Sequence, residues 1–292
     1  MVRTAFVLAV LVTVGAKYLA FPQTSAPRSE QYVKVVSVKL EGVDTVPQPV
    51  LRSAEDAVEQ TVFRSSELSE RTRAMVKRIL VWAGYRDATV EAPTTTPAAG
   101  AAGNESVKAI DLTVRVNAGD QYHISGVAIA GTQAVTPQEV RDLIPFHPGD
   151  VDDIGKMLKA LTEIRKLYAC NGYVKAIPVP LVDIHHATRT SYLTVEMREG
   201  KRYAISSVNL AGFDDGTTEK LLTAPGLQTG ETFSSCRIKA SVDEWSGAAR
   251  RPFVIEVTPD DQTGKVAVVL RATGDSQRDG EIVERATVHS LR

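Results

Sequence analysis

Three segments of the chain alternate apolar and polar positions and close on a glycine. They are residues 32–42 (YVKVVSVKLEG), 122–131 (YHISGVAIAG) and 203–212 (YAISSVNLAG). Alternation with a period of two is typical of a half-buried strand, and the closing glycine favours a turn. The glycines recur roughly every 80–90 residues, which is the length of a small domain rather than of a solenoid unit. The pattern predicts three tandem repeats that each begin with a strand.

Two helices are predicted inside each repeat, most clearly in the second. Residues 136–139 (TPQE) combine an N-cap threonine, a proline in the first turn and a capping-box glutamate. An apolar stripe at intervals of three and four residues follows, made of Ile154, Met157, Leu158, Leu161, Ile164 and Tyr168. Gly172 stands where this second helix should end.

A Gly-Tyr pair marks the end of the second helix in two of the repeats. Gly84-Tyr85 and Gly172-Tyr173 are each followed by an extended segment and then by an alternating strand, at residues 110–116 and 193–197. The third repeat is degenerate, because Pro252-Phe253 stands where Gly-Tyr is due. Each repeat therefore reads β-α-α-β-β, which predicts an α+β fold.

These landmarks divide the chain into segments. We expect a signal peptide at 1–20, a linker at 21–30, repeat 1 at 31–119, repeat 2 at 120–200, repeat 3 at 201–274 and a flexible tail at 275–292. Repeat 1 carries a low-complexity insertion at 93–106, which is typical of a mobile hairpin tip. The N-terminal segment has Arg3 before a short apolar run that ends at Lys17, a pattern of export signals. An uncleaved inner-membrane anchor is the alternative for this segment.

Composition narrows the functional classes. The 34 basic and 35 acidic residues leave a net charge of −1, so there is no electrostatic case for nucleic acid. No later segment approaches the apolar length of a membrane-spanning helix, so none is expected in the mature chain. Export would permit a disulfide, but the repeats put Cys170 and Cys236 in different domains, which argues against their pairing.

The order of strands, helices and glycines resembles the polypeptide-transport-associated (POTRA) domain. Tandem copies of this module occur in outer-membrane barrel-assembly proteins of the BamA/TamA type. The second repeat carries the resemblance best, in YHISGVAIAG, LYACNGYVKA and TVEMREG. The resemblance implies a three-stranded mixed sheet packed on two helices in each repeat. In the family a C-terminal barrel follows, whereas only residues 275–292 follow repeat 3, so we expect a chain that binds polypeptide without inserting barrels.

The resemblance also implies that partners bind by adding a strand to an exposed sheet edge. In the family this edge is commonly the strand after Gly-Tyr, which here gives residues 85–92, 173–182 and 253–257. The candidate partner-binding residues are Tyr85, Thr89, Tyr173, Val174, Ala176, Phe253 and Ile255. Pro178 and Pro180 lie inside the second of these strands, and proline fits only an edge position because it cannot donate to a ladder.

Enzymatic chemistry has little support in the sequence. His185-His186 is a weak metal candidate and is better explained as a hairpin tip between two strands. Asp152-Asp153 precedes the second helix of repeat 2, which predicts an N-cap. Asp260-Asp261 is expected at a turn, and both tyrosines that follow Gly84 and Gly172 are expected to be packing residues. We therefore expect no enzyme, no cofactor and no metal.

The leading hypothesis is a periplasmic, non-enzymatic scaffold that binds outer-membrane protein precursors or envelope assembly proteins. Such a scaffold could associate with the outer membrane through a barrel protein that it binds. The alternative is an inner-membrane-anchored subunit of the divisome or another envelope complex, of the FtsQ type.

Overall fold

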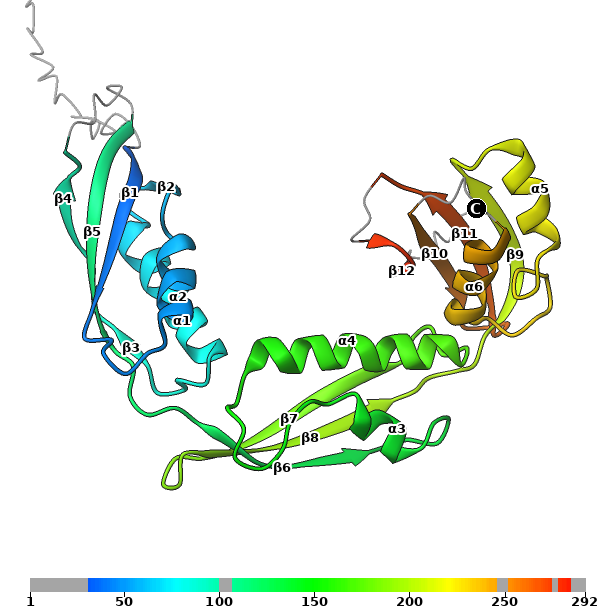
Figure 1. Cartoon of the computed structure of the whole chain (residues 1–292), viewed down its shortest axis with the longest axis horizontal. Coiled ribbons are helices and arrows are strands. Elements are labelled where there is room, and N and C mark those ends of the chain that lie inside the picture. The colour runs from blue at the N-terminus through cyan, green and yellow to red at the C-terminus, as the bar shows by residue number, and fades with distance from the viewer. Residues whose placement is uncertain (1–30, 100–106, 246–251, 275–277, 285–292) are drawn as a thin grey trace, which may run out of the picture.

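The computed structural model describes residues 31–99, 107–245, 252–274 and 278–284 (Figure 1). It contains three successive α+β units, which we call domain 1, domain 2 and domain 3 in chain order. The predicted fold class is confirmed, since each unit has the order β-α-α-β-β, to which domains 1 and 3 add short strands. The predicted signal peptide and linker lie outside the described residues.

Domain 1 is built on two long parallel strands. Its elements are β1 (Tyr32–Glu41), α1 (Gln48–Asp56), β2 (Val62–Arg64), α2 (Leu68–Trp82), β3 (Thr89–Val90), β4 (Thr94–Pro97) and β5 (Val107–Asn117). β1 pairs in parallel with β5, while β2 lies on the other side of β1 and the short β3 and β4 both pair with β5. Alternate residues of β1 and β5 turn inward and pack against α1 and α2.

Domain 2 follows the same plan with one uninterrupted edge strand. Its elements are β6 (His123–Ala130), α3 (Pro137–Asp142), α4 (Ile154–Cys170), β7 (Ile177–His185) and β8 (Thr190–Arg198), with the sheet order β6-β8-β7. The predicted capping box is confirmed, because the Thr136 side chain accepts from Glu139 N–H and the Glu139 carboxylate accepts from Thr136 N–H. Ile164 and Tyr168 of the predicted stripe are fully buried in the core of the domain, whereas Leu158 is 43% exposed.

Domain 3 has a fourth strand. Its elements are β9 (Ala204–Ala211), α5 (Asp215–Thr223), α6 (Ser235–Trp245), β10 (Phe253–Asp260), β11 (Lys265–Ala272) and β12 (Glu281–Glu284). The sheet order is β12-β10-β11-β9, and β12 runs parallel to β10. Ile282 of β12 packs against the apolar core of the domain.

Two local predictions were wrong. Part of the tail predicted to be flexible, at 275–292, forms β12, because backbone groups of β10 hold it and Ile282 reaches the core. Part of the insertion predicted as a mobile tip, at 93–106, forms β4, which is paired with β5 between Thr94 and Pro97, while its residues 100–106 lie outside the described residues. Both segments gain order from a neighbouring strand, which local composition does not reveal.

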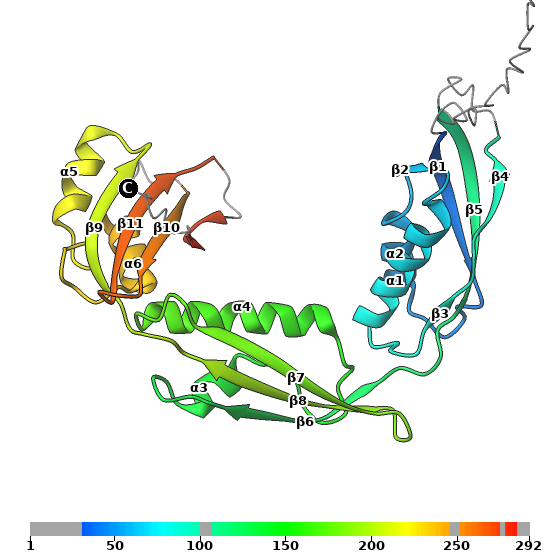
Figure 2. The ribbon, with the colours of Figure 1, turned by 180° about the vertical axis from the view of Figure 1, so that it is seen from behind.

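The domains follow one another in a U-shaped arrangement with domain 2 at the base (Figures 1 and 2). Domains 1 and 3 rise on the same side of domain 2, and α4 lies along the inner side of the U. The sheet of domain 2 lies beneath α4 and faces away from the space between the arms.

Candidate functional site

The strand after the second helix lies at the sheet edge in domain 2. β7 is the last strand in the order β6-β8-β7, as the two prolines predicted. Among the described residues its outer side carries no further strand. The backbone groups on that side are therefore the ones that could pair with another chain.

Domain 3 shows which backbone groups of this strand point outward. The Phe253 carbonyl accepts from Gly280 N–H at 2.7 Å, and Phe253 N–H donates to the Asp279 carboxylate at 3.3 Å. Both partners lie on the β12 side of β10, so Phe253 and every second residue after it face outward. The hairpins match in register, because Asp260 pairs with Lys265 as His185 pairs with Thr190.

The outward-facing residues of β7 are, by this register, Pro178, Pro180, Val182 and Ile184, and we call them the β7 edge. All four carbonyls can accept a hydrogen bond, but proline has no N–H. Only Val182 and Ile184 can donate. An added strand could therefore both donate to and accept from β7 only near the β7–β8 hairpin, at Val182 and Ile184.

The corresponding edge of domain 1 is interrupted. β3 has two residues and β4 has four, and both pair with the same strand, β5. Pro93 lies between the two strands and Pro97 ends the second. Short strands and prolines are common means of blocking an edge.

The corresponding edge of domain 3 is covered. We call the outward groups of Phe253, Ile255 and Val257 the β10 edge. β12 pairs with it in parallel, with Ile255 opposite Ile282 and Val257 opposite Glu284. The corresponding sheet edge thus differs among the three domains. It is interrupted in domain 1, limited by prolines in domain 2, and covered by another strand of the same chain in domain 3.

The residues chosen from the sequence lie near these edges but mostly not on them. Both strands that follow Gly-Tyr begin four residues after the tyrosine, since a turn intervenes. Tyr85, Tyr173, Val174 and Ala176 precede the strands and are buried or half-buried, so their expected places in an edge strand were wrong. The packing roles of the two tyrosines are confirmed: Tyr85 donates to the Thr45 carbonyl, and Tyr173 packs edge-on against Tyr168.

The remaining candidates do lie in edge strands. Thr89 is exposed in β3. Phe253 and Ile255 begin β10 with fully buried side chains, so only their backbone groups can take part in pairing.

The outer face of the domain 2 sheet carries exposed apolar side chains that sequence analysis did not single out. Ile177 and Leu181 of β7 are 55% and 49% exposed, and Tyr192 of β8 is 40% exposed. Gly126 of β6 leaves room for the Tyr192 ring, because a Cβ there would lie 2.6 Å from the ring. The alternation of β7 contained this signal, since Ile177 and Leu181 are apolar at positions expected to be polar on an open face.

The junction of domains 1 and 2 is a network of polar contacts. Asp152 is only 3% exposed, and it accepts hydrogen bonds from Arg86 Nε of domain 1 at 2.7 Å and from Ser191 Oγ at 2.6 Å. The prediction that both aspartates cap the helix was therefore wrong for Asp152. It is right for Asp153, which is the N-cap of α4 and accepts from Lys156 N–H.

A second cluster lies on the same junction. The Tyr122 hydroxyl donates to Asp87 at 2.7 Å, and His186 Nδ1 lies at the same distance from that hydroxyl. Arg189 adds ion pairs to Asp87 and to Asp120. The histidine pair does lie at the β7–β8 hairpin tip, where His186 meets domain 1 and His185 lies 3.3 Å from Asp183.

The two Gly-Tyr glycines lie against the following domain. Gly84 and Gly172 have φ values of +92° and +95°, which favour glycine, and their carbonyls accept from Tyr122 N–H and Tyr203 N–H. A Cβ at Gly172 would lie 2.9 Å from Thr232 Cγ2 and 3.1 Å from the Phe233 carbonyl oxygen. This landmark therefore marks a domain junction as well as a helix end.

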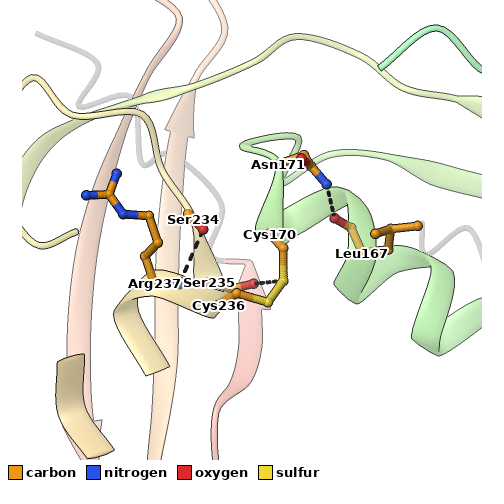
Figure 3. Close-up of a disulfide and its surroundings, with 7 residues drawn as sticks. All are labelled: Leu167, Cys170, Asn171, Ser234, Ser235, Cys236 and Arg237. Carbon is orange, nitrogen blue, oxygen red and sulfur yellow. Dashed lines mark hydrogen bonds between the residues drawn. A yellow bond between two sulfur atoms is a disulfide. The ribbon is translucent and has the colours of Figure 1, made fainter. Parts of the chain in front are cut away.

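Domains 2 and 3 are joined by a disulfide. Cys170 is the last residue of α4 and Cys236 is the second residue of α6, and their Cα atoms are 4.9 Å apart (Figure 3). Ser235 Oγ lies 3.5 Å from the Cys170 sulfur. The expectation that the cysteines do not pair was wrong, because the ends of two helices from adjacent domains meet here.

Charged groups strengthen the same junction. Asp261, in the β10–β11 turn where aspartate was predicted, accepts from Lys175 of domain 2 at 2.7 Å and from the Tyr203 hydroxyl. The Lys175 ammonium and the Tyr203 hydroxyl hold the pKa of Asp261 below its usual range. The Tyr203 pKa is raised by burial and by the bond to Asp261.

The described part of the chain offers no candidate metal site and no candidate membrane-spanning helix. It holds no group of three or more histidine, cysteine, aspartate or glutamate side chains suited to a metal ion. Within the same residues, no helix is both long enough and apolar enough to cross a bilayer.

Comparison with known proteins gives a family match for domain 2. Residues 122–200 match the POTRA family, described as "Surface antigen variable number repeat". A putative outer membrane protein assembly factor of Treponema pallidum (strain Nichols) is 25% identical over 181 residues, or 62% of this chain. The chain spans only 21% of that protein's length.

Solved structures give one match at the level of the fold and a second, weaker match. The crystal structure of POTRA domains 3–5 of Haemophilus influenzae BamA is 18% identical, covers 85% of this chain and 99% of its own, and superposes with a TM-score of 0.58. The N-terminal domain of Omp85 from Thermosynechococcus elongatus is 14% identical, covers 83% and 97%, and has a TM-score of 0.33. At this identity the first match establishes the fold alone. Residues 122–200 thus match the POTRA family, and the chain as a whole has the fold of three tandem POTRA domains.

Proposed function

We propose that this chain is a non-enzymatic periplasmic scaffold that binds outer-membrane protein precursors or envelope assembly partners by strand addition. The observation that carries the proposal is the β7 edge, where Val182 and Ile184 offer amide donors at the end of the domain 2 sheet. The name of the Treponema relative, an assembly factor, supports the choice of partner.

Strand addition at this edge is necessarily short. Two donors and the neighbouring carbonyls can pair with a segment of about four residues, and each backbone hydrogen bond contributes about 0.5–1.5 kcal/mol net. Leu181 and Tyr192 lie on the adjacent outer face and offer apolar contact to side chains of the added strand. The result is a weak contact with little demand on sequence, which suits a transient carrier of unfolded precursors.

The disulfide supports an extracytoplasmic compartment. Structural disulfides persist in the bacterial periplasm and are rare in the cytosol, where thiols are kept reduced. The bond between Cys170 and Cys236 is therefore consistent with the export signal predicted at residues 1–20.

The experiment measures how proline and its removal at the β7 edge change peptide binding. The probe is a labelled peptide with the sequence of a terminal strand of an outer-membrane barrel protein. Ile184→Pro deletes one of the two donors and should weaken binding about ten-fold, whereas Ile184→Ala keeps the N–H and serves as the matched control. Pro180→Ala adds a donor and should strengthen binding.

The opposite signs of the two changes make this test specific. General damage to the fold would weaken binding in every variant. Equal affinities for the native chain, Ile184→Pro and Pro180→Ala would rule out strand addition at β7.

A further inference from the structure

β12 occupies the β10 edge as an added strand would. It pairs in parallel with residues 254–257 in a register of four residues. Gly280 N–H donates to the Phe253 carbonyl at 2.7 Å, and the Asp279 carboxylate accepts from Phe253 N–H. Backbone pairing of this kind makes few demands on the sequence of the strand that is added.

The side chains of this segment show what the β10 edge selects. Ile282 packs against the core of domain 3, which makes it the apolar anchor. Asp279 lies 3.1 Å from Lys239 Nζ of α6. Glu281 and Glu284 line a groove of about 470 Å³ between α4, α6 and β12.

The groove is basic on its helical sides and is continuous with the domain 2–3 junction. Arg165 and Lys166 of α4 and Lys239 of α6 line it, and the Cys170–Cys236 disulfide lies in its wall. An acidic extended segment therefore meets cations from both helices. This charge complementarity fits the three acidic residues that β12 and its preceding turn place there.

Few buried contacts keep β12 in place on β10. The strand has four residues, of which Glu281 and Glu284 are exposed and Ile282 and Val283 are half-buried. Segments with few buried apolar contacts are the ones that open locally at low free-energy cost. The β10 edge beneath it offers three donors, at Phe253, Ile255 and Val257, one more than the β7 edge.

We propose that β12 is a built-in, displaceable occupant of the β10 edge, and that the edge accepts an extended acidic segment of a partner in its place. The partner strand runs parallel to β10, with an apolar residue where Ile282 packs and a carboxylate where Asp279 lies. The inference rests on the strand addition proposed above and concerns its regulation: the β10 edge is closed until β12 leaves.

The test uses the full chain and a capped peptide with the sequence of residues 278–284 (RDGEIVE). Ile282→Lys removes the apolar anchor of β12 and should release it, whereas Val283→Lys places the same charge on the opposite face and is the matched control. Ile282→Lys should bind the peptide at least about ten-fold more tightly than the native chain, because the state with an uncovered β10 edge becomes the most populated one. Val283→Lys should bind the peptide with the same affinity as the native chain. A peptide with the same residues in scrambled order should not bind the release variant.

Gly280→Pro gives a second, independent release. It removes the N–H donated to Phe253, and proline cannot adopt the φ of +72° found at Gly280. Native-like circular dichroism checks that both release variants remain folded. Equal peptide affinity for the native chain and for both release variants would overturn the inference.

A second peptide, from a strand of an outer-membrane barrel protein, separates this inference from the proposed function. If the released chain binds RDGEIVE while no variant binds the barrel peptide, self-occupancy stands and the proposed function fails. If the barrel peptide binds native and released chains equally and RDGEIVE binds neither, the proposed function stands and the inference fails.

Discussion

The disulfide between domains 2 and 3 predicts a large and specific loss of stability on its removal. The bond joins Cys170 to Cys236 across 66 residues of chain. That segment includes β7, β8, β9 and α5, so it belongs to both domains. Removing the bond should therefore destabilise the two domains together.

The magnitude follows from the entropy of the closed loop. In the chain-entropy model a loop of this length restricts the unfolded chain by about 4 kcal/mol at 25 °C. The double variant Cys170→Ser/Cys236→Ser should lose about that much free energy of unfolding.

The assay is urea unfolding followed by circular dichroism, with hydrogen exchange to assign the loss to domains. Amides of domains 2 and 3 should exchange faster in the double variant, while those of domain 1 should change little. Dithiothreitol should destabilise the native chain and leave the double variant unchanged, which serves as the control. A loss below about 1 kcal/mol, or equal sensitivity of both proteins to dithiothreitol, would refute the loop-entropy reasoning.

Three further predictions concern the junctions. Gly172→Ala should cost about 1–2 kcal/mol in backbone strain and should also widen the angle between domains 2 and 3, measured by small-angle scattering. Gly149→Ala is the control, because Gly149 has a similar φ but open space around it, so the angle should not change. Asp152→Asn should lower the free energy of unfolding by about 3 kcal/mol in urea titrations, because it leaves the largely buried Arg86 without its carboxylate. The same change at Asp153, the adjacent N-cap, should be neutral. Lys175 holds the folded-state pKa of Asp261 below its unfolded value of about 3.9. The contribution of Asp261 to the stability of the domain 2–3 junction is therefore complete above that pH and is lost as the pH falls through the folded pKa. In the disulfide-free variant, the radius of gyration should therefore rise on acidification below about pH 4, and Lys175→Met should remove that dependence.

Much of the fold could be predicted from the sequence because its signals are local. The alternating strands, the capping box at Thr136 and the apolar stripe of the second helix each lie within about twenty residues. The structure forms each of these elements where expected, except that Leu158 of the stripe is exposed instead of buried. The prolines of β7 likewise report an edge directly, since the missing N–H is a property of the residue itself.

The features that were missed depend on contacts between distant segments. Asp152 looks like an N-cap because it stands beside one, but its partner Arg86 is in another domain. The cysteines look separate because they belong to different repeats, yet two helix ends meet at the junction. β12 has only two apolar residues, too few for a strand pattern, and its order comes from β10.

The candidate site was predicted in part. The strand chosen after Gly-Tyr does lie at the sheet edge in domain 2, but the turn that follows the tyrosine shifted the start of two strands by four residues. Local patterns did not indicate that the β10 edge is covered, because the covering strand, β12, lies after β11. The outward-facing amide donors of β7 are accordingly Val182 and Ile184, not the residues nearest Tyr173.

The most direct test of the account is amide exchange at Val182 and Ile184, followed by NMR as the barrel-strand peptide is added to the full chain. Strand addition at the β7 edge predicts slower exchange at these two amides. Their neighbours Leu181 and Asp183, whose N–H groups point toward β8, should change little. Unchanged exchange at Val182 and Ile184 in a chain saturated with peptide would contradict the central claim.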